Sequence, residues 1–410
     1  MALIVQKYGG TSLANPDRIA NVANRVVKGW EQGHKMVVVL SAMAGETDRL
    51  IRLAREMAED PDARELDVLL ATGEQTTVSL FSIFLRAQGV PATSLLSHQA
   101  RIYTDRAYGR ARILGIDTDR IKEELKKNRI VTVAGFQGVD EVGNITTLGR
   151  GGSDTTAVAM AAALKADLCE IYTDVDGIYT TDPRLCPKAR KLERISYDEM
   201  LELSSMGAKV LEIRSVGFAR RYSVPLVVRS SFSEEPGTLV TVEDEEMEIV
   251  PVSGVALSRN DARVTITRVP DRPGVAMHLF QPVANANIVV DMIIQNTSTD
   301  GYTDLTFTVP KGDLKKTLEI VKPVAADIGA EQVLSEENIA KVSIVGVGMK
   351  NNAGVAAKMF EAMAAENINI LMISTSEIKI SCVIEDKYGE LAVRVLHDAF
   401  GLENPPPKKR

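Results

Sequence analysis

The first half of the chain alternates short apolar runs with longer segments in which apolar residues recur at helical spacing. Buried strands are predicted where the apolar runs are uninterrupted, at residues 2–6, 37–40, 130–134 and 168–172. Helices are predicted where the spacing is 3.6 residues, at 19–30, at 65–87 with an interruption near Gly73, and at 155–164. Fully apolar strands separated by helices are typical of a largely parallel sheet, so this region is predicted to be an α/β domain.

The pattern changes after about residue 230. Residues 230–237 are rich in turn formers, and residues 243–248 are strongly acidic. A domain boundary is therefore predicted near residue 245, which separates a first domain at 1–245 from a second region at 249–410.

The second region contains an internal repeat. The segment 263–266 is similar to 341–344, and the matching turns and second strands follow in the same order. Each copy predicts a strand, a glycine-containing turn, a helix, an asparagine turn and a strand, so two α+β modules are expected at about 263–335 and 341–400. One alternative is that the two copies serve only as a platform for dimerisation.

Composition narrows the possible functions. Apolar residues make up 45% and charged residues 25% of the chain, as in ordinary globular proteins, and the net charge of −7 argues against a broad nucleic-acid surface. Cys169, Cys186 and Cys382 form no metal-binding or disulfide pattern, which predicts reduced thiols, a cytoplasmic location and no structural metal site. No run approaches 18 apolar residues, so no membrane span is expected.

The segment Lys7–Ser12 follows the first predicted strand. Gly9 and Gly10 would let backbone N–H groups approach phosphate oxygens, and Lys7 would supply a positive charge for a phosphoryl group in transfer. The motif is not a Walker A loop. The alternative is a plain Gly-Gly turn beside a surface lysine.

The segment 147–156 places three glycines next to Arg150, Ser153 and Asp154, directly before a predicted helix. An arginine can bind a carboxylate through two parallel hydrogen bonds, so Arg150 is a candidate ligand for a carboxylate substrate. The alternative is that Ser153 or Asp154 caps the helix, but capping explains neither the arginine nor the glycines.

Three more polar segments lie at predicted strand ends or helix breaks. Residues 172–184 mix carboxylates, hydroxyls and an arginine, which favours a nucleotide loop over an EF-hand because the EF-hand spacing is absent. Residues 41–48 and Glu74 are weaker candidates, since an ordinary loop and a surface glutamate would look the same. The four histidines lie outside any nucleophile motif.

Together these segments resemble the aspartate kinase family: KYGGTS at 7–12, TLGRGGSDTTA at 147–157 and YTDVDGIYTTDPR at 172–184. The third is shared with glutamate 5-kinase and other enzymes of that fold, whereas the second, followed by a pair of ACT modules, is more specific. The resemblance implies an amino-acid-kinase-type sandwich with a mainly parallel central sheet, then two ferredoxin-like ACT modules of the α+β class. Because one module is typically inserted within the other in this family, the resemblance also implies that 249–262 pairs with the second module.

The implied reaction moves the γ-phosphate of ATP, with Mg²⁺, to the side-chain carboxylate of L-aspartate. This is the first step of lysine, threonine, methionine and diaminopimelate synthesis in the family. The resemblance implies that Lys7 stabilises the phosphoryl group, that Asp154 orients the reacting groups, and that aspartate contacts Ser41, Thr47, Glu74, Arg150 and Ser153. It implies that ATP contacts Lys7, Tyr8, Gly9, Gly10, Thr173, Asp174, Tyr179, Asp182, Arg184 and Lys209. A carboxylate is ionised at neutral pH, so the acceptor needs no general base.

The ACT pair implies feedback inhibition by lysine, threonine or both, bound between modules of two subunits, and therefore a homo-oligomer. The implied effector residues of the first module are Asp271, Arg272, Pro273, Gly274, Val275, Ala276, Val289, Asp291 and Gln295. Those of the second are Asn352, Val355, Ala356, Asn369, Ile370, Ser374, Thr375 and Glu377. Many relatives have Asn where this chain has Val289, which cannot make the amide hydrogen bonds. Met247 is suitably placed for the internal start of a short subunit, as in some relatives.

Two other readings remain open. The chain could be another kinase of the same fold that acts on glutamate or acetylglutamate, although the ACT pair and Arg150 argue against this. It could also be a catalytically silent amino-acid sensor, although a sensor has no need to keep Lys7, Glu74, Arg150 and Asp154 together.

Overall fold

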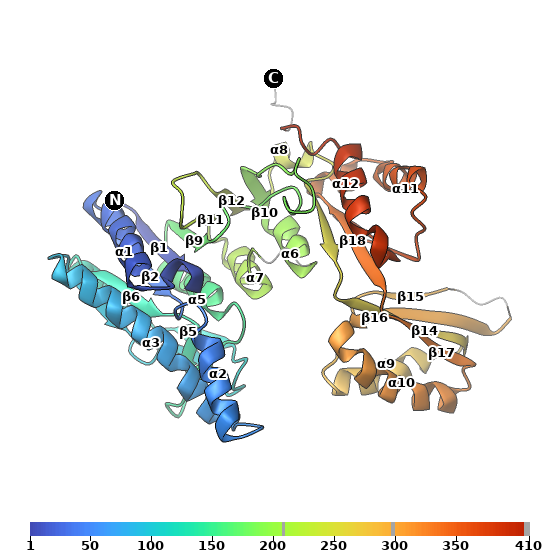
Figure 1. Cartoon of the computed structure of the whole chain (residues 1–410), viewed down its shortest axis with the longest axis horizontal. Helices are drawn as coiled ribbons and strands as arrows, with labels where there is room; N and C mark the ends of the chain where they lie inside the picture. Colours follow the sequence, from blue (N-terminus) through green and yellow to red (C-terminus); the bar gives the residue numbers. More distant parts are fainter. Residues whose placement is uncertain (207–209, 297–299, 406–410) are drawn as a thin grey trace. The chain divides into compact units, whose positions relative to one another are not determined.

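The computed structural model describes residues 1–206, 210–296 and 300–405 of the 410-residue chain. The chain forms two compact units, and Figure 1 shows most of the first in blue to green and most of the second in yellow to red. Unit 1 comprises 1–179 and 191–247, and unit 2 comprises 180–190 and 248–410. Residues 180–190, expected from the sequence in the first domain, thus group with the second unit.

Unit 1 is built on an eight-stranded sheet in which all pairings but one are parallel. In spatial order its strands are β10 (Arg194–Ser196), β12 (Thr238–Thr241), β11 (Leu226–Ser230), β9 (Leu168–Thr173), β1 (Leu3–Tyr8), β2 (Lys35–Leu40), β6 (Ile130–Ala134) and β3 (Ala92–Leu95). The exception is the pairing between β11 and β12, which is antiparallel. The predicted α/β class and mainly parallel sheet are confirmed.

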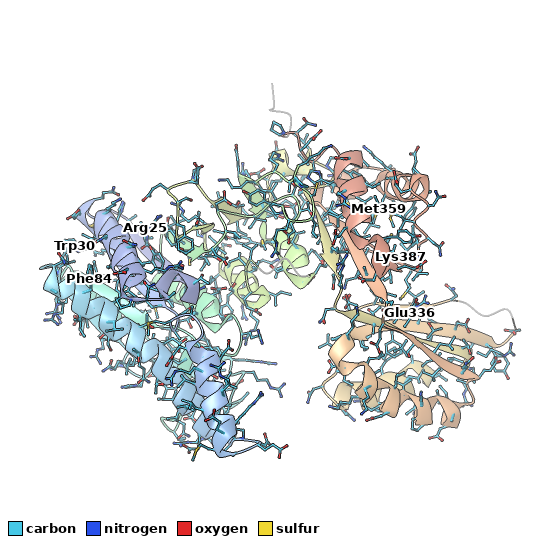
Figure 2. The ribbon with its side chains drawn as sticks, in the orientation of Figure 1. Arg25, Trp30, Phe84, Glu336, Met359 and Lys387 are labelled. Atoms are coloured by element: carbon cyan, nitrogen blue, oxygen red, sulfur yellow. The ribbon has the colours of Figure 1, made fainter. Side chains whose placement is uncertain are left out.

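Helices cover this sheet. In each helix, the spacing of the apolar residues decides which face of the helix is buried. Helix α1 (Pro16–Glu31) begins three residues before the predicted segment 19–30, with Asn15 as N-cap and Pro16 in the first turn. It shares a core with α3 (Ala63–Ala87), β1 and β2, and Trp30 and Phe84 (Figure 2) pack at the edge of this core. The other helices are α2 (Glu46–Met57), α4 (Asp119–Lys126), α5 (Gly152–Leu164), α6 (Tyr197–Ser205), α7 (Ile213–Tyr222) and α8 (Glu245–Glu248).

Helix α3 passes through Gly73 without a break, so the predicted interruption is wrong. A Cβ at Gly73 would lie 2.8 Å from the Cβ of Ala42, which is closer than packing allows. The glycine therefore lets α3 approach the chain that leaves β2. This close approach brings Glu74, the next residue, next to the same segment.

Helix α3 is also long and apolar enough, by length and composition, to cross a membrane, which the sequence analysis did not expect. Half of its most apolar window (50%) is buried inside the protein, and Val78, Phe81 and Leu85 belong to the core described above. Helices at the centre of water-soluble domains have the same composition, so this single helix is weak evidence for a membrane.

A second, smaller sheet completes unit 1. Its strands, in spatial order, are β5 (Ile113–Ile116), β4 (Ile102–Thr104), β7 (Gln137–Val139) and β8 (Ile145–Thr147). Strands β7 and β8 form a hairpin that leads directly into the glycine-rich segment before α5. This sheet therefore positions the start of that segment.

Unit 2 contains two four-stranded antiparallel sheets, one for each repeat. The first module holds β15 (Ile293–Gln295), β16 (Tyr302–Pro310), β14 (Asp261–Pro270), β17 (Gln332–Glu336), α9 (Val275–Asn285) and α10 (Leu314–Ile328). The second holds β13 (Gly254–Ser258), β18 (Ile339–Val345), β20 (Lys379–Glu385), β19 (Met372–Thr375), α11 (Val355–Ala365) and α12 (Gly389–Ala399). The predicted α+β modules are confirmed.

The fourth strand of each module comes from a different place in the chain. In the first module β17 pairs with β14, whereas in the second β13, which precedes both modules, pairs with β18. The segment 180–190 also joins the second module, because Leu185 and Cys186 pack in the same core as Met359 (Figure 2). A hydrogen bond of 2.9 Å between Thr180 Oγ1 and His397 Nε2 ties the segment to α12.

Candidate active site

A cavity of about 730 Å³ opens in unit 1 beside the carboxyl ends of β1 and β2. In parallel sheets, this edge is where ligands bind. The cavity wall brings together nine of the residues singled out from the sequence: Lys7, Gly9, Gly10, Ser41, Thr47, Glu74, Arg150, Ser153 and Asp154. These residues come from four separate parts of the chain, so the fold joins motifs that the sequence shows only as neighbours of strands and helices.

An ion pair between Lys7 and Asp154 lies at the centre of this wall. The Lys7 Nζ is 2.6 Å from Asp154 Oδ1, and the two side chains are only 11% and 12% exposed. Lys7 is the penultimate residue of β1, and Asp154 lies in the first turn of α5. A Cβ at Gly9 would lie 3.3 Å from the Lys7 Nζ, so the glycine leaves room for the ammonium.

Glu74 is a buried carboxylate with a free oxygen. Its side chain points from α3 to the segment after β2, where Oε1 accepts a hydrogen bond of 3.0 Å from the backbone N–H of Ala42. Within the described residues, Oε2 is buried without a partner. Burial raises the pKa of Glu74 to about 7, although the Ala42 hydrogen bond lowers it. A ligand ammonium would satisfy this oxygen and favour the ionised form.

Arg150 lies in the exposed turn between β8 and α5, at the edge of the cavity. The N-cap of α5 is Gly151, and no side chain caps the helix, so the alternative role of Ser153 or Asp154 as a cap is wrong. The Arg214 guanidinium donates to the carbonyl oxygens of Leu148 and Arg150 and so fixes the turn from behind.

Two helices begin at the cavity and direct backbone N–H groups toward it. Gly45, Thr47 and Asp48 belong to the start of α2, and Gly152 and Ser153 to the start of α5. Helix N-termini carry partial positive charge and bind phosphate groups. Together with Lys7 and Arg150, they make the cavity suitable for an anionic ligand that also carries an ammonium.

The sequence analysis missed several residues of the wall, among them Phe136 and Asp67. Phe136 lines the cavity with a backbone φ of 67°, a left-handed conformation that is rare for a bulky residue. Asp67 lines it from α3 and is 1% exposed. Asp67 lies seven residues before Glu74, on the same face of the helix, so helical spacing could have revealed it.

The residues predicted to bind ATP do not all lie in this cavity. The Tyr8 side chain is fully buried and stacks on Tyr172, with ring centroids 4.5 Å apart, so only its backbone can face a ligand and a side-chain role is excluded. Thr173 ends β9 in unit 1, and Asp174 and Tyr179 follow it. Asp182 and Arg184 belong to unit 2 and pair with each other. Lys209 lies outside the described residues.

The predicted effector residues form two equivalent turns in unit 2. Gly274 and Gly354 have φ values of 92° and 90° and precede the first residues of α9 and α11. The side chains of Val275 and Val355 pack in the module cores, so a side-chain role in effector binding is excluded and only backbone contact remains as the prediction.

The other predicted effector residues lie around these turns. Val289 is 69% exposed, and Asp291 forms an ion pair with Lys341 of β18 in the second module. Asn352 donates a hydrogen bond of 2.8 Å to the carbonyl oxygen of Gly348. The remaining predicted side chains are exposed or half-buried: Asp271, Arg272, Pro273, Ala276, Gln295, Ala356, Asn369, Ile370, Ser374, Thr375 and Glu377.

Comparison with protein families finds a matching family for each of the two units. The amino acid kinase family matches residues 2–230, and ACT domains match 263–326 and 342–400. An aspartokinase of Pseudomonas aeruginosa is 60% identical over 407 residues, which is 99% of each chain. An aspartokinase of Helicobacter pylori is 53% identical over 405 residues, covering 98% of this chain and all (100%) of the relative.

Solved structures agree with these matches. Aspartokinase III of E. coli in complex with aspartate and ADP, in the R-state, has a TM-score of 0.77 and 28% identity, with 97% of this chain and 99% of that chain covered. The same enzyme in complex with lysine and aspartate, in the T-state, has a TM-score of 0.76 at the same identity and coverage.

Proposed function

Because this chain belongs to the aspartate kinases of the amino acid kinase family, we propose that its cavity transfers the γ-phosphate of ATP to the side-chain carboxylate of L-aspartate. The product would be 4-phospho-L-aspartate. The family and its nucleotide-dependent kinase activity are shown by relatives that are 58–60% identical over nearly the whole chain. The roles of single residues are the proposal.

The observation that carries the proposal is the Lys7–Asp154 pair in a cavity that also holds Glu74 and Arg150. The free Glu74 oxygen would accept a hydrogen bond from the aspartate ammonium, and Arg150 would bind the α-carboxylate through two parallel hydrogen bonds. Ser41, Thr47 and Ser153 would surround the acceptor carboxylate. Substrate is thus held by groups of opposite charge at both ends of its amino-acid backbone.

Phosphoryl transfer needs positioning and neutralisation of charge rather than a base. Lys7 would neutralise the phosphoryl oxygens in transfer, and Asp154 would hold the Lys7 ammonium in place. Backbone N–H groups of Gly9, Gly10 and the two helix starts would support the phosphates. Mg²⁺ would supply further positive charge to the ATP phosphates, and Asp174 after β9 is the carboxylate that would hold it.

A hydroxylamine trap tests this function. The protein is incubated with Mg-ATP and hydroxylamine, and hydroxamate is measured with aspartate, glutamate or acetylglutamate as acceptor. We expect hydroxamate with aspartate alone. Hydroxamate with glutamate or acetylglutamate instead would favour another kinase of the same fold. A folded protein that binds amino acids but forms no hydroxamate would favour the silent sensor.

We further propose that lysine, threonine or both inhibit the enzyme through the ACT modules, as the first control point of their biosynthesis. The T-state complex of E. coli aspartokinase III with lysine supports lysine as an effector. The exposed turns at Gly274 and Gly354 support binding of an amino-acid carboxylate, since they present the N-termini of α9 and α11. Repeating the trap with each amino acid tests this.

The proposal includes a cytoplasmic homo-oligomer. The three cysteines are buried and unpaired, which supports a reducing compartment. Assembly as a dimer or larger through the ACT modules, and a short subunit begun at Met247, follow from the family resemblance alone. Light scattering of the purified protein and its mass spectrum would test both.

A further inference from the structure

Asp67 is a buried carboxylate in the cavity wall for which the proposed function has no role. It lies in the second turn of α3 and is 1% exposed. The oxygens accept hydrogen bonds from three donors: the Gly109 N–H at 3.0 Å to both oxygens, the Thr147 N–H at 2.8 Å, and the Thr147 hydroxyl at 2.6 Å. Within the described residues, no lysine or arginine lies close enough to shift the pKa of Asp67.

Burial raises the pKa of Asp67, and the hydrogen bonds from Thr147 and Gly109 lower it. A buried carboxylate without a cation is costly and persists only when its oxygens are well satisfied. The three donors satisfy both oxygens. An asparagine could not replace it, since its NH₂ group would face donors where an acceptor is needed.

The donors of Asp67 connect the two segments that lead to Arg150. Thr147 ends β8, three residues before Arg150, and its carbonyl oxygen accepts a hydrogen bond of 2.8 Å from the Ala111 N–H. Gly109 belongs to the 105–111 loop, and a Cβ at Gly149 would lie 3.0 Å from the Gly109 carbonyl oxygen. The loop therefore packs directly on the turn that carries Arg150.

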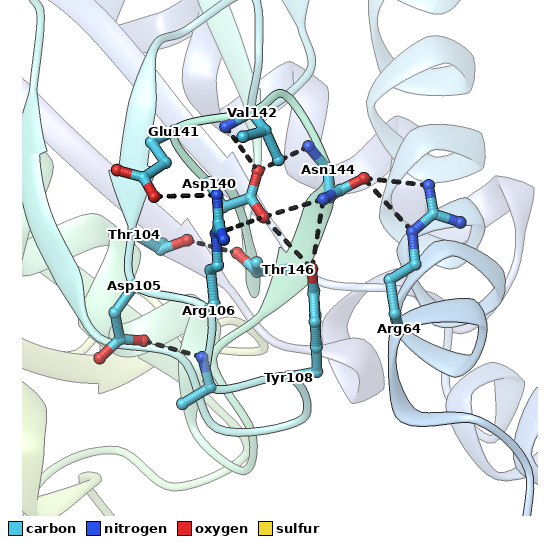
Figure 3. A network of polar contacts seen from close by, with 11 residues as sticks. Arg64, Thr104, Asp105, Arg106, Tyr108, Asp140, Glu141, Val142, Asn144 and Thr146 are labelled. Carbon is cyan, nitrogen blue, oxygen red and sulfur yellow. Dashed lines mark hydrogen bonds and ion pairs between the residues drawn. The ribbon is translucent and has the colours of Figure 1, made fainter.

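A second set of contacts holds the same loop away from the cavity. Tyr108 donates to Asp140 at 3.2 Å, Asn144 donates to both, and Arg64 of α3 donates to Asn144 (Figure 3). Arg106 pairs with Asp140 and Glu141. These residues do not line the cavity. They hold the loop to the β7–β8 hairpin at a distance from the cavity, whereas Asp67 holds the loop and the end of β8 on the cavity side.

We propose that Asp67 is a positioning residue for the aspartate site: its carboxylate fixes the end of β8 and the 105–111 loop, and so sets where Arg150 meets the substrate α-carboxylate. This inference rests on the proposed function. Asp67 does not touch the reacting atoms. Its removal would displace Arg150, while Lys7, Gly9 and Gly10 belong to β1 and the segment after it and would stay in place.

The test is the separate KM for aspartate and for ATP in Asp67→Asn. We expect the aspartate KM to rise about tenfold or more, because a small displacement of a binding group has large effects, with the ATP KM changed less than about twofold. A loss of folded protein would lower kcat and leave both KM values as they were. A wild-type aspartate KM in this variant would overturn the proposal, whatever its kcat.

Three further variants sharpen the result. Thr147→Val removes only the hydroxyl donor and should raise the aspartate KM by a smaller factor than Asp67→Asn does. Thr147→Ser keeps the hydroxyl donor and should have the wild-type aspartate KM. Glu124→Gln is the matched control, since Glu124 is also buried but pairs with Lys127 and Arg129 away from the cavity. Its aspartate KM should be unchanged; an equal rise there would contradict the role of Asp67. Failure of the proposed function itself would appear in the wild-type protein, as turnover that does not depend on aspartate.

Discussion

At the scale of single residues, the site depends on charges that are held where water cannot screen them. Lys7 and Asp154 are nearly buried and in contact, whereas most ion pairs of this chain lie at the surface and contribute little. A buried ammonium with one fixed partner has a defined position. That position is what a kinase needs, since it acts by neutralising charge that develops during transfer.

Replacing Lys7 tests this directly. In Lys7→Met the ammonium is lost, and we expect kcat to fall about a thousandfold because the transferring phosphoryl group loses its nearest cation. Asp154 would be left without its partner, so Tm should also fall, but the protein should remain folded at room temperature by circular dichroism. Lys28→Met is the control, since Lys28 is 69% exposed and lies outside the cavity. Near-normal turnover of Lys7→Met would exclude the role given to Lys7.

Glu74 predicts a dependence of substrate affinity on pH. Its pKa of about 7 means that the carboxylate becomes protonated as pH falls through that value, and a neutral carboxyl binds an ammonium poorly. We expect the aspartate KM to rise as pH is lowered from about 8 to about 6. Glu74→Gln should show a high aspartate KM at every pH. A flat profile in the wild type would show that Glu74 does not bind the ammonium.

Ionised Glu74 should also lower the free energy of unfolding. Because the folded pKa is raised above the unfolded value of 4.5, Glu74 destabilises the folded state progressively as pH rises from 4.5 to about 7, and the penalty is constant above that. Without ligand, Glu74→Gln should therefore be more stable than wild type by about 3 kcal/mol at about pH 8 and nearly equal at about pH 4. Urea unfolding at both pH values measures this, with Glu65→Gln, exposed on the same helix, as control.

At the scale of elements, the position of α3 controls the site. Gly73 allows the helix to approach Ala42, and this approach places Glu74 against the Ala42 N–H. Gly73→Ala should push the segment after β2 away from α3, lower kcat/KM for aspartate about tenfold and reduce Tm.

Gly217 offers the matched control for this change. It lies inside α7, where a Cβ would meet nothing within 4 Å. Gly217→Ala should leave activity unchanged and stabilise the protein by about 0.5–1 kcal/mol, because glycine is a poor helix former. Equal loss of activity in both variants would show that the effect at position 73 is not a matter of close approach.

The elements that sequence predicted well are those in which local pattern and burial agree. The apolar runs at 37–40, 130–134 and 168–172 are strands of the central sheet, and the repeat in the second region is a pair of equivalent modules. The prediction failed at Gly73, because a glycine inside a helical pattern indicates a break unless a partner from elsewhere in the chain requires it. Helical spacing places Asp67 on the same face of α3 as Glu74, but its contacts could not be predicted, since its partners are 42 and 80 residues away.

At the scale of the whole molecule, the chain passes between the units three times, after residues 179, 190 and 247. The first two passages place 180–190 in unit 2, although this segment continues the motif at 172–184 that the sequence assigns to the nucleotide. A motif is continuous in sequence and gives no sign that it divides between two compact units. The contacts of Leu185, Cys186 and Thr180 with the second module are long-range and could not be predicted.

This division predicts how inhibition reaches the catalytic unit. If effector binding changes the second module, the covalent segment 180–190 carries the change to the residues on either side of it, Tyr179 and Lys191, which belong to unit 1. Thr180→Val removes the bond to His397 and the bond that the Thr180 hydroxyl accepts from the Arg190 N–H. We expect lysine or threonine to bind this variant with unchanged affinity by calorimetry but to inhibit it several-fold more weakly than wild type. Thr317→Val, a buried threonine in α10 of the first module, is the control and should be inhibited normally. Full inhibition of Thr180→Val would show that the signal travels by another route.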